Sequence, residues 1–156
     1  MNFFILKFFK DDKGVAFIET ALVLPFLILI ISGIFEYANY ALINNKLVRA
    51  AGVIGDMVAR QNLNRSNLIA IMQTADKIIQ PFNNTTNAQV VVSEIYNSKF
   101  STDTSKMVIS WQQQINGANS RLGTPGNVPV NLPSNITVIN DQSLIVTEVF
   151  FNYSPR

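Results

Sequence analysis

The feature that most constrains this chain is one long apolar run near its N-terminus. Residues 15–34 read VAFIETALVLPFLILIISGI, and Glu19 is the single ionisable side chain among them. Because a helix rises about 1.5 Å per residue, this run spans roughly 30 Å, the thickness of the hydrocarbon core of a bilayer. The alternative is a buried helix of a soluble domain, but a chain of 156 residues hardly covers all sides of so apolar a helix. We therefore expect a transmembrane segment over residues 15–35.

The composition excludes several classes of function. The chain has no Cys and no His, which removes thiolate catalysis and the commonest general base and metal ligand. It contains no H-E-x-x-H, no G-x-S-x-G and no phosphate-binding glycine-rich loop. The charged residues are scattered and sum to +2, so no basic surface for nucleic acid is expected. We predict that the chain is not an enzyme and that it has no cofactor, no metal site and no nucleic-acid partner.

The segment before the run resembles a leader held in the cytoplasm. Residues 1–14 (MNFFILKFFKDDKG) carry three lysines, against Lys46 and Arg49 soon after the run, a small bias in the direction of the positive-inside rule. A secretory signal peptide has a shorter apolar core that is followed by a small-residue cleavage site, and no such site follows here. Any cleavage is therefore expected before the run, so that the product keeps the helix.

A specific arrangement lies at the junction of leader and run. Lys13-Gly14 is followed by four residues, then by Glu19 and by ALVLP at positions 21–25. This arrangement resembles the leader that prepilin peptidases recognise, and more closely the TadE/TadF-like minor pilins, or pseudopilins, of the tight-adherence (Flp, type IVc) pilus system. The chain departs from the pattern at Thr20, where an aromatic residue commonly follows the Glu. It is also far longer than the major pilins of these systems, which favours a minor pilin.

The resemblance implies a precursor that is cut between Gly14 and Val15. The product would assemble through its apolar helix into a tight-adherence pilus, or at the base or tip of one, for adhesion to surfaces. The implied partners are a prepilin peptidase, other pilin subunits, the inner-membrane assembly platform and membrane lipid. The implied location is the bacterial inner membrane, crossed once, with the N-terminus cytoplasmic and the globular part periplasmic, or extracellular in the assembled pilus.

Glu19 has a physical role in this hypothesis. After the cut, the new ammonium group of Val15 lies four residues before Glu19, about one helical turn away. A carboxylate in hydrocarbon is costly and is rarely retained without a partner. The partner is either the amine of the same chain or that of a neighbouring subunit, and the resemblance favours the neighbour, where the pair sets the axial register. In the alternative interpretation Glu19 only extends to the lipid headgroups.

Gly14 and Pro25 each have a plainer interpretation as well. A glycine before a helix is often only a flexible start, and Gly14 gains its meaning from its position beside Lys13 at the membrane edge. Pro25 removes one helical hydrogen bond and clashes with the carbonyl four residues earlier, which predicts a kink or an unwound turn. A bend of this kind suits helices that pack in a filament, but membrane helices also tolerate proline without a functional reason.

The helical pattern continues beyond the run. Its apolar stripe consists of Leu47, Ala51, Ile54 and Val58. On another face Asp56 precedes Arg60 by four residues, a spacing that supports a helix. We predict a nearly continuous helix over residues 15–61, roughly 70 Å long. The stripe is expected to contact the globular part of the same chain.

The remainder of the chain predicts a small globular part. A second helix is expected over residues 68–80, capped by Ser66 or Asn67 and stopped by Pro81. Short β-rich runs follow and predict three or four antiparallel strands. They cover residues 89–96, 106–114, 135–140 and 144–153. The segment over residues 116–134 is rich in Gly and Pro, and we expect it to be mobile or ordered by a partner.

Single polar residues in the globular part carry no clear chemistry. Glu94 and Glu148 are isolated acids that we expect to be solvated. Trp111 is either part of a small core or a surface that stacks on a sugar or binds a partner.

These inferences combine into one α+β architecture, with a long membrane helix that continues into a globular domain with a second helix and a three- to four-stranded antiparallel sheet. The expected organisation is a leader (1–14), a transmembrane segment (15–35), a helix extension (36–62) and an extracytoplasmic domain (63–156). The alternative function is a signal-anchored periplasmic binding protein whose leader is not cleaved. A small membrane-bound enzyme is a third hypothesis.

Overall fold

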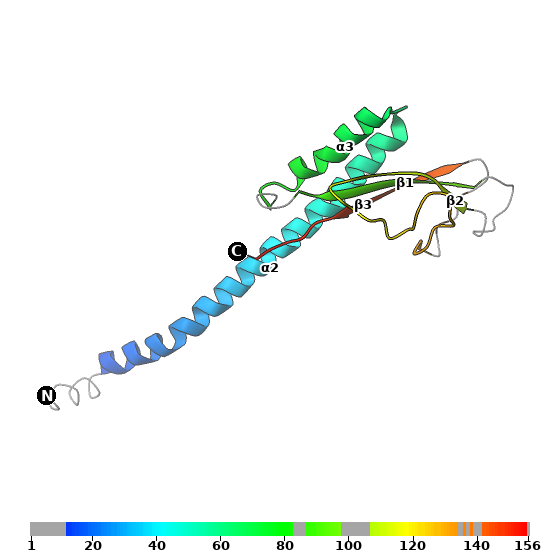
Figure 1. The fold of residues 1–156 in the computed structure, drawn as a ribbon. Coiled ribbons are helices and arrows are strands. Elements are labelled where there is room, and N and C mark those ends of the chain that lie inside the picture. The colour runs from blue at the N-terminus through cyan, green and yellow to red at the C-terminus, as the bar shows by residue number, and fades with distance from the viewer. Residues whose placement is uncertain are drawn as a thin grey trace. The chain divides into compact units, whose positions relative to one another are not determined.

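The computed structural model describes residues 12–82, 87–97, 107–133, 136, 138 and 142–155. Its elements are the helices α2 (Asp12–Arg60) and α3 (Arg65–Ile78) and the strands β1 (Gln89–Asn97), β2 (Met107–Ile115) and β3 (Ser143–Phe150) (Figure 1). The chain divides into two compact units, an N-terminal unit (Met1–Ala41 with Pro155–Arg156) and a globular unit (Leu42–Ser154). The predicted α+β class is confirmed.

Helix α2 runs for 49 residues without interruption. The predicted continuous helix is therefore confirmed, and it begins at Asp12, three residues before the expected start at Val15. Pro25 lies inside α2, which is helical on both sides of it, so the helix is not unwound there. The expected pair on the outer face is present, with Arg60 Nε 2.7 Å from Asp56 Oδ1. Because both side chains are exposed, this pair contributes only about 0.3–0.5 kcal/mol.

Helix α3 begins earlier than the sequence pattern predicted. Asn64 has extended backbone angles, and its side-chain Oδ1 accepts a hydrogen bond of 2.8 Å from the backbone N–H of Asn67. This geometry makes Asn64 the N-cap, because it satisfies one of the free amides of the first turn. The prediction of Ser66 or Asn67 as the cap was wrong, since both residues lie inside the helix.

The three strands form one antiparallel sheet in the order β2-β1-β3, so β1 is central. The register pairs Val92 of β1 with Gln113 of β2 and with Thr147 of β3. A β-bulge between Glu94 and Ile95 interrupts the β1–β2 ladder. Three of the four predicted strands are confirmed, and the fourth, over residues 135–140, falls largely outside the described residues.

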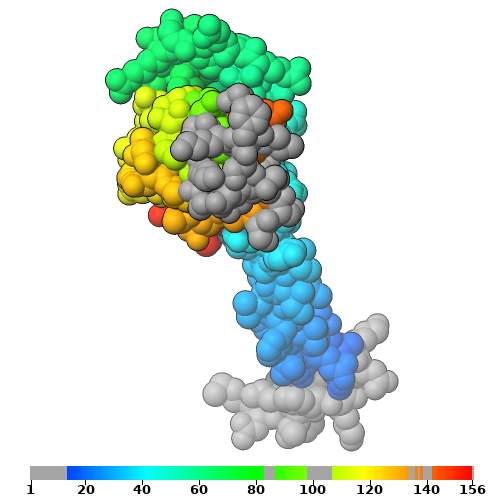
Figure 2. Space-filling view, turned by 90° about the vertical axis from the view of Figure 1, so that its right-hand side faces the viewer, coloured from blue at the N-terminus to red at the C-terminus, as the bar shows by residue number. Residues whose placement is uncertain are grey.

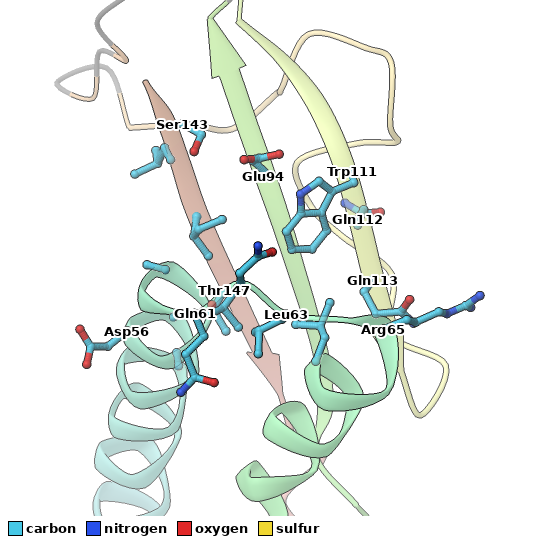
Figure 3. Close-up of a pocket in the computed structure, with 18 of the residues that line it drawn as sticks. Asp56, Gln61, Leu63, Arg65, Glu94, Trp111, Gln112, Gln113, Ser143 and Thr147 are labelled. Carbon is cyan, nitrogen blue, oxygen red and sulfur yellow. The ribbon is translucent and has the colours of Figure 1, made fainter. Parts of the chain in front are cut away.

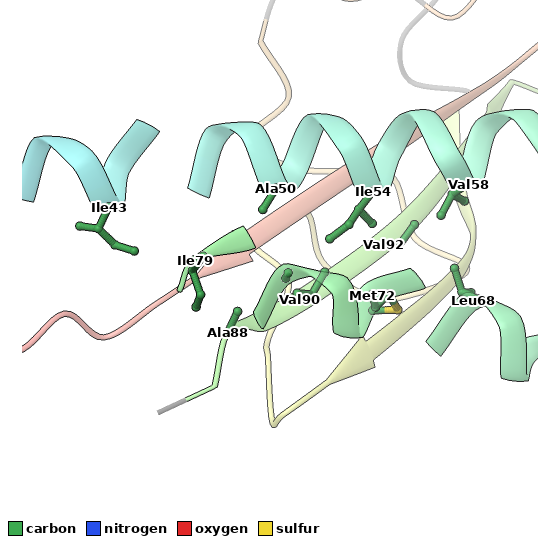
Figure 4. Close-up of a cluster of buried hydrophobic side chains, with 11 residues drawn as sticks. Ile43, Ala50, Ile54, Val58, Leu68, Met72, Ile79, Ala88, Val90 and Val92 are labelled. Carbon is green, nitrogen blue, oxygen red and sulfur yellow. The ribbon is translucent and has the colours of Figure 1, made fainter. Parts of the chain in front are cut away.

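Helices α2 and α3 pack on one face of the sheet (Figures 1 and 4). The buried members of this core are Ile43, Ala50, Ile54 and Val58 of α2, Leu68, Met72, Ala75 and Ile79 in and after α3, and Ala88, Val90 and Val92 in and before β1. The expected contact of the α2 stripe with the globular part is confirmed. The stripe is rotated slightly, because Ile43 and Ala50 are buried while Leu47 and Ala51 are only half-buried at its edge.

The opposite face of the sheet is covered by the segment between β2 and β3. Leu122 of this segment is 4% exposed and belongs to a second core. The other buried members of that core are Ile95, Met107, Ile109 and Val138. The segment also pairs with β2, since the Gly126 N–H donates to Ile109 O (2.8 Å) and the Ile109 N–H donates to Asn127 O (3.0 Å).

Residues 116–134 were expected to be mobile or ordered by a partner, whereas the chain's own sheet holds the described part of this segment. It supplies apolar side chains to a core and hydrogen bonds to a strand edge, both of which fix its conformation. In Figure 2 it forms a continuous yellow and orange surface of the globular unit. The cover also explains why the second face of β3 carries apolar residues such as Leu144 and Val146.

Lys46 of α2 contacts the residues that follow α3, and through them the C-terminal segment. Its ammonium group donates a hydrogen bond to the Gln80 carbonyl after α3 and lies 5.8 Å from the centroid of the Phe82 ring. The Phe82 ring in turn meets Tyr153 edge-on, with centroids 6.1 Å apart. The C-terminal segment is thus held to the helices by an aromatic and cationic cluster.

Candidate functional site

The N-terminal unit consists mainly of an apolar helix whose large side chains are exposed. The large hydrophobic side chains from Val15 to Phe35 are between 41% and 70% exposed. A surface of this size is not stable in water and requires lipid or partner helices. Within the described residues, α2 is the one helix long and apolar enough to cross a membrane. It fits a membrane anchor, as the sequence predicted.

Glu19 lies within this apolar surface. Its side chain is exposed, and it forms no hydrogen bond or ion pair with the other described residues. Val15 and Val23 lie one turn before and after it on the same helix. The neighbouring Thr20 is satisfied locally, because its hydroxyl donates to the Ala16 carbonyl at 2.8 Å. Glu19 is therefore a charged group in an apolar segment without a partner among the described residues.

The predicted processing site lies at the beginning of the same helix. Gly14 and Val15 belong to the first turn of α2, which starts at Asp12. Four residues lie between Gly14 and Glu19, and Pro25 lies further along the same segment. The four residues singled out from the sequence are thus on one helix of the N-terminal unit.

Two tyrosines near the end of the apolar run were not singled out from the sequence. Tyr37 is 74% exposed and Tyr40 is 58% exposed. Tyrosine is enriched where membrane helices leave the hydrocarbon for the headgroups. Their position directly after the run is the signal that identifies them as candidates for the interface.

The globular unit carries a groove of about 1170 Å³ on the helix-side face of the sheet (Figure 3). Its walls are the end of α2, the α2–α3 connection and the start of α3, and its floor is part of the sheet. Figure 3 shows the strands extending beyond the α2–α3 connection. The helices therefore cover only part of this face of the sheet, and the uncovered part includes Glu94 and Trp111.

Glu94 and Trp111 are direct cross-strand partners in the register of β1 and β2. Both side chains are half-buried and line the groove. Trp111 also packs against the helix-side core. It is therefore in part a core residue and in part an exposed surface of the groove, the two alternatives expected from the sequence. Glu94 is less solvated than expected, and it has no hydrogen-bond or ion-pair partner among the described residues.

Glu148 differs from the expected solvated acid. Its Oε2 accepts a hydrogen bond of 2.5 Å from the Ser120 hydroxyl, and its Oε1 accepts one of 2.9 Å from the Arg121 backbone N–H. The Arg121 guanidinium lies 5.1 Å from the centroid of the Phe150 ring. Glu148 therefore holds the covering segment against β3, which is a structural role that the sequence did not reveal.

These observations define a protein with an apolar N-terminal helix that fits a membrane anchor, followed by a small α+β unit. Residues 14–53 match the sequence family described as TadE-like protein, which confirms the predicted resemblance over this stretch. The match includes Gly14, Val15, Glu19 and Pro25 and ends inside α2. The match covers 40 of the 156 residues, and over this stretch the chain is similar to TadE-like proteins. No curated protein and no solved structure matches the chain.

Proposed function

We propose that the protein is a minor pilin, or pseudopilin, of a tight-adherence pilus, without catalytic activity of its own. A prepilin peptidase cuts the precursor after Gly14, and the product assembles through its apolar helix into the pilus, or at its base or tip, where it serves surface attachment. The observation that carries the proposal is an exposed apolar helix with a lone Glu19, in the segment that matches TadE-like proteins.

Glu19 is the assembly residue in this proposal. Cleavage creates an ammonium group on Val15, and a helix that lacks other charges over residues 15–34 offers Glu19 no second partner. In a bundle of such helices, the amine of one subunit pairs with the carboxylate of the next, because a paired charge costs far less in hydrocarbon than an isolated one. The pair then sets the axial offset between neighbouring helices.

The proposed location is the bacterial inner membrane, with residues 1–14 cytoplasmic and the globular unit periplasmic until assembly. The lysines of the leader support this orientation through the positive-inside rule. The proposed partners are the prepilin peptidase, other pilin subunits, the inner-membrane assembly platform and lipid around the helix.

The test is mass analysis of the intact protein from the membrane fraction, in hosts with and without the prepilin peptidase. We expect a mature form that begins at Val15 in the first host and the full precursor in the second. Gly14→Val provides a matched variant that should keep the leader in both hosts, because a branched side chain blocks approach to the scissile bond. A wild-type product that keeps residues 1–14 in both hosts would contradict the proposal.

A second candidate is a signal-anchored periplasmic binding protein whose leader is not cleaved. This function is favoured by the groove, where Trp111 lies beside a half-buried Glu94 that has no hydrogen-bond or ion-pair partner among the described residues. The same mass measurement separates the two functions, since only the second predicts an intact N-terminus in every host.

A further inference from the structure

We propose that the groove of the globular unit binds an arginine or lysine side chain, presented by a segment of another protein, and that Glu94 and Trp111 receive it. The inference concerns the globular unit alone and does not rest on leader cleavage or pilus assembly.

Glu94 and Trp111 lie next to each other on neighbouring strands. Glu94 on β1 and Trp111 on β2 are directly opposite each other, and side chains at such positions share one face of the sheet with Cβ atoms about 4.5–5.5 Å apart. The bulge that follows Glu94 is a feature that re-aims side chains on a strand. Figure 3 shows the carboxylate and the indole ring side by side on the part of the sheet that the helices leave uncovered.

The carboxylate of Glu94 has no counterion among the described residues. The Glu94 residue is half-buried, and no described residue compensates its carboxylate with a hydrogen bond or an ion pair. Arg65 is the one cationic residue among the described residues that line the groove. It forms no ion pair with Glu94, and Figure 3 shows its side chain directed away. The site therefore carries an unneutralised negative charge.

A cation is complementary to both Glu94 and Trp111. A guanidinium or ammonium group at this position makes a charge-assisted hydrogen bond to the carboxylate and stacks on the face of the indole ring. A neutral ligand satisfies the hydrogen bonds of Glu94 but leaves its charge uncompensated. The combination of an aromatic ring with a carboxylate thus selects a cation.

The size and the lining of the groove suit a segment of another protein. Its volume of about 1170 Å³ exceeds what one side chain fills, so it accommodates the chain segment that carries the cation. The lining mixes apolar Leu63 and Ile145 with amides such as Gln113, as interfaces between proteins do. Arginine and tryptophan are the residues that most often dominate the energy of such interfaces.

The test uses the only tryptophan of the chain as its reporter, because Trp111 emission then reports on this groove alone. The full chain in detergent micelles is titrated with acetyl-Gly-Arg-Gly-amide and with the same peptide carrying citrulline, which is neutral and nearly the same shape. We expect a saturable change in emission with arginine, weakened by salt, and binding about tenfold or more weaker with citrulline.

Two variants complete the experiment. Glu94→Gln should weaken arginine binding about tenfold or more, since it removes the charge and keeps the shape. Asp56→Asn is the matched control, because Asp56 also lines the groove but is paired with Arg60 and points away in Figure 3, so its binding should equal that of the wild type. If Glu94→Gln does not fold, the comparison of arginine with citrulline on the wild type decides alone.

Three results would overturn the inference. The first is no saturable change in Trp111 emission with the arginine peptide. The second is equal binding of the arginine and citrulline peptides. The third is binding of tetra-N-acetylchitotetraose that exceeds that of the arginine peptide and survives Glu94→Gln, which would assign the groove to saccharides.

Discussion

Gly55 of α2 lies directly against Thr147 of β3, so that a Cβ atom at position 55 would come 3.2 Å from Thr147 Oγ1. This hydroxyl is buried and has no hydrogen-bond partner among the described residues. The close approach of helix and strand therefore depends on a residue without a side chain. Gly52, one turn earlier on the same helix, has nothing within 4 Å of the corresponding position.

We expect substitution by alanine to affect stability differently at the two glycines. Gly52→Ala should raise the free energy of unfolding by about 0.5–1 kcal/mol, because alanine is the better helix former and its methyl group meets open space. Gly55→Ala should be less stable than Gly52→Ala by about 1 kcal/mol or more, because its methyl group crowds Thr147. Urea unfolding of the full chain in detergent, followed by Trp111 fluorescence, measures both.

A double-mutant cycle isolates the contact. In a Thr147→Ala background the crowding atom is absent, so Gly55→Ala should give the same gain as Gly52→Ala. Equal gains from both glycines in the wild-type background would show that Thr147 moves aside without cost.

We expect the removal of the Glu148 side chain to loosen the segment that covers the sheet. Glu148→Ala removes the acceptor for the Ser120 hydroxyl and for the Arg121 amide, which we expect to cost about 1–3 kcal/mol. Amide hydrogen exchange should rise around residues 118–130 first. Glu94→Ala is the control, because Glu94 has no partner among the described residues and its removal should not lower stability. Unchanged exchange in Glu148→Ala would contradict the holding role.

The N-cap of α3 gives a prediction with an internal control. Asn64→Ala should lower the free energy of unfolding by about 1 kcal/mol, because the side chain of Asn64 accepts the Asn67 amide. Asn67→Ala should change it by less than about 0.5 kcal/mol, because Asn67 contributes only its backbone and its side chain is exposed. Thermal unfolding measures both variants. A larger loss of stability in Asn67→Ala than in Asn64→Ala would identify Asn67 as the cap.

The elements that could be predicted are those whose hydrophobic pattern is long and regular. The run over residues 15–34 and the spacing of Ile54 and Val58 identified α2, because a periodic stripe averages over many residues. The cap of α3 could not be fixed in this way. Asn64, Ser66 and Asn67 are all good cap residues, and the backbone angles at Asn64 decide among them.

The cover of the second sheet face was missed for a different reason. Gly123 and Gly126 have positive φ angles of 110° and 87°, and such glycines are typical both of flexible loops and of tightly folded ones. The segment is ordered by long-range contacts, namely those of Leu122 in the core and of the Glu148 carboxylate on β3. A pattern along the sequence does not contain these contacts. The groove was missed likewise, since it depends on where the helices end over the sheet.

Glu19 provides the sharpest test of assembly. Glu19→Ala should insert into the membrane as well as the wild type, because it removes a charge that is costly in hydrocarbon. The amount of the variant in pili should fall about tenfold or more, because the Val15 amine of a neighbouring subunit then lacks its partner and the helices lose their register. Alkali extraction of membranes measures insertion, and the amount of the chain in sheared pili measures assembly.

The neighbouring Thr20 supplies the control for Glu19. Thr20→Val removes a hydroxyl that bonds only the Ala16 carbonyl of the same helix, so both insertion and assembly should remain at the wild-type level. Glu19→Asp keeps the charge but shortens the reach by one methylene, and we expect it to restore part of the assembly that Glu19→Ala loses. If Glu19→Ala assembles at the wild-type level, the ion pair does not set the register, because a register set by the pair cannot survive the loss of the charge. Contact with the lipid headgroups would then be the role of this carboxylate.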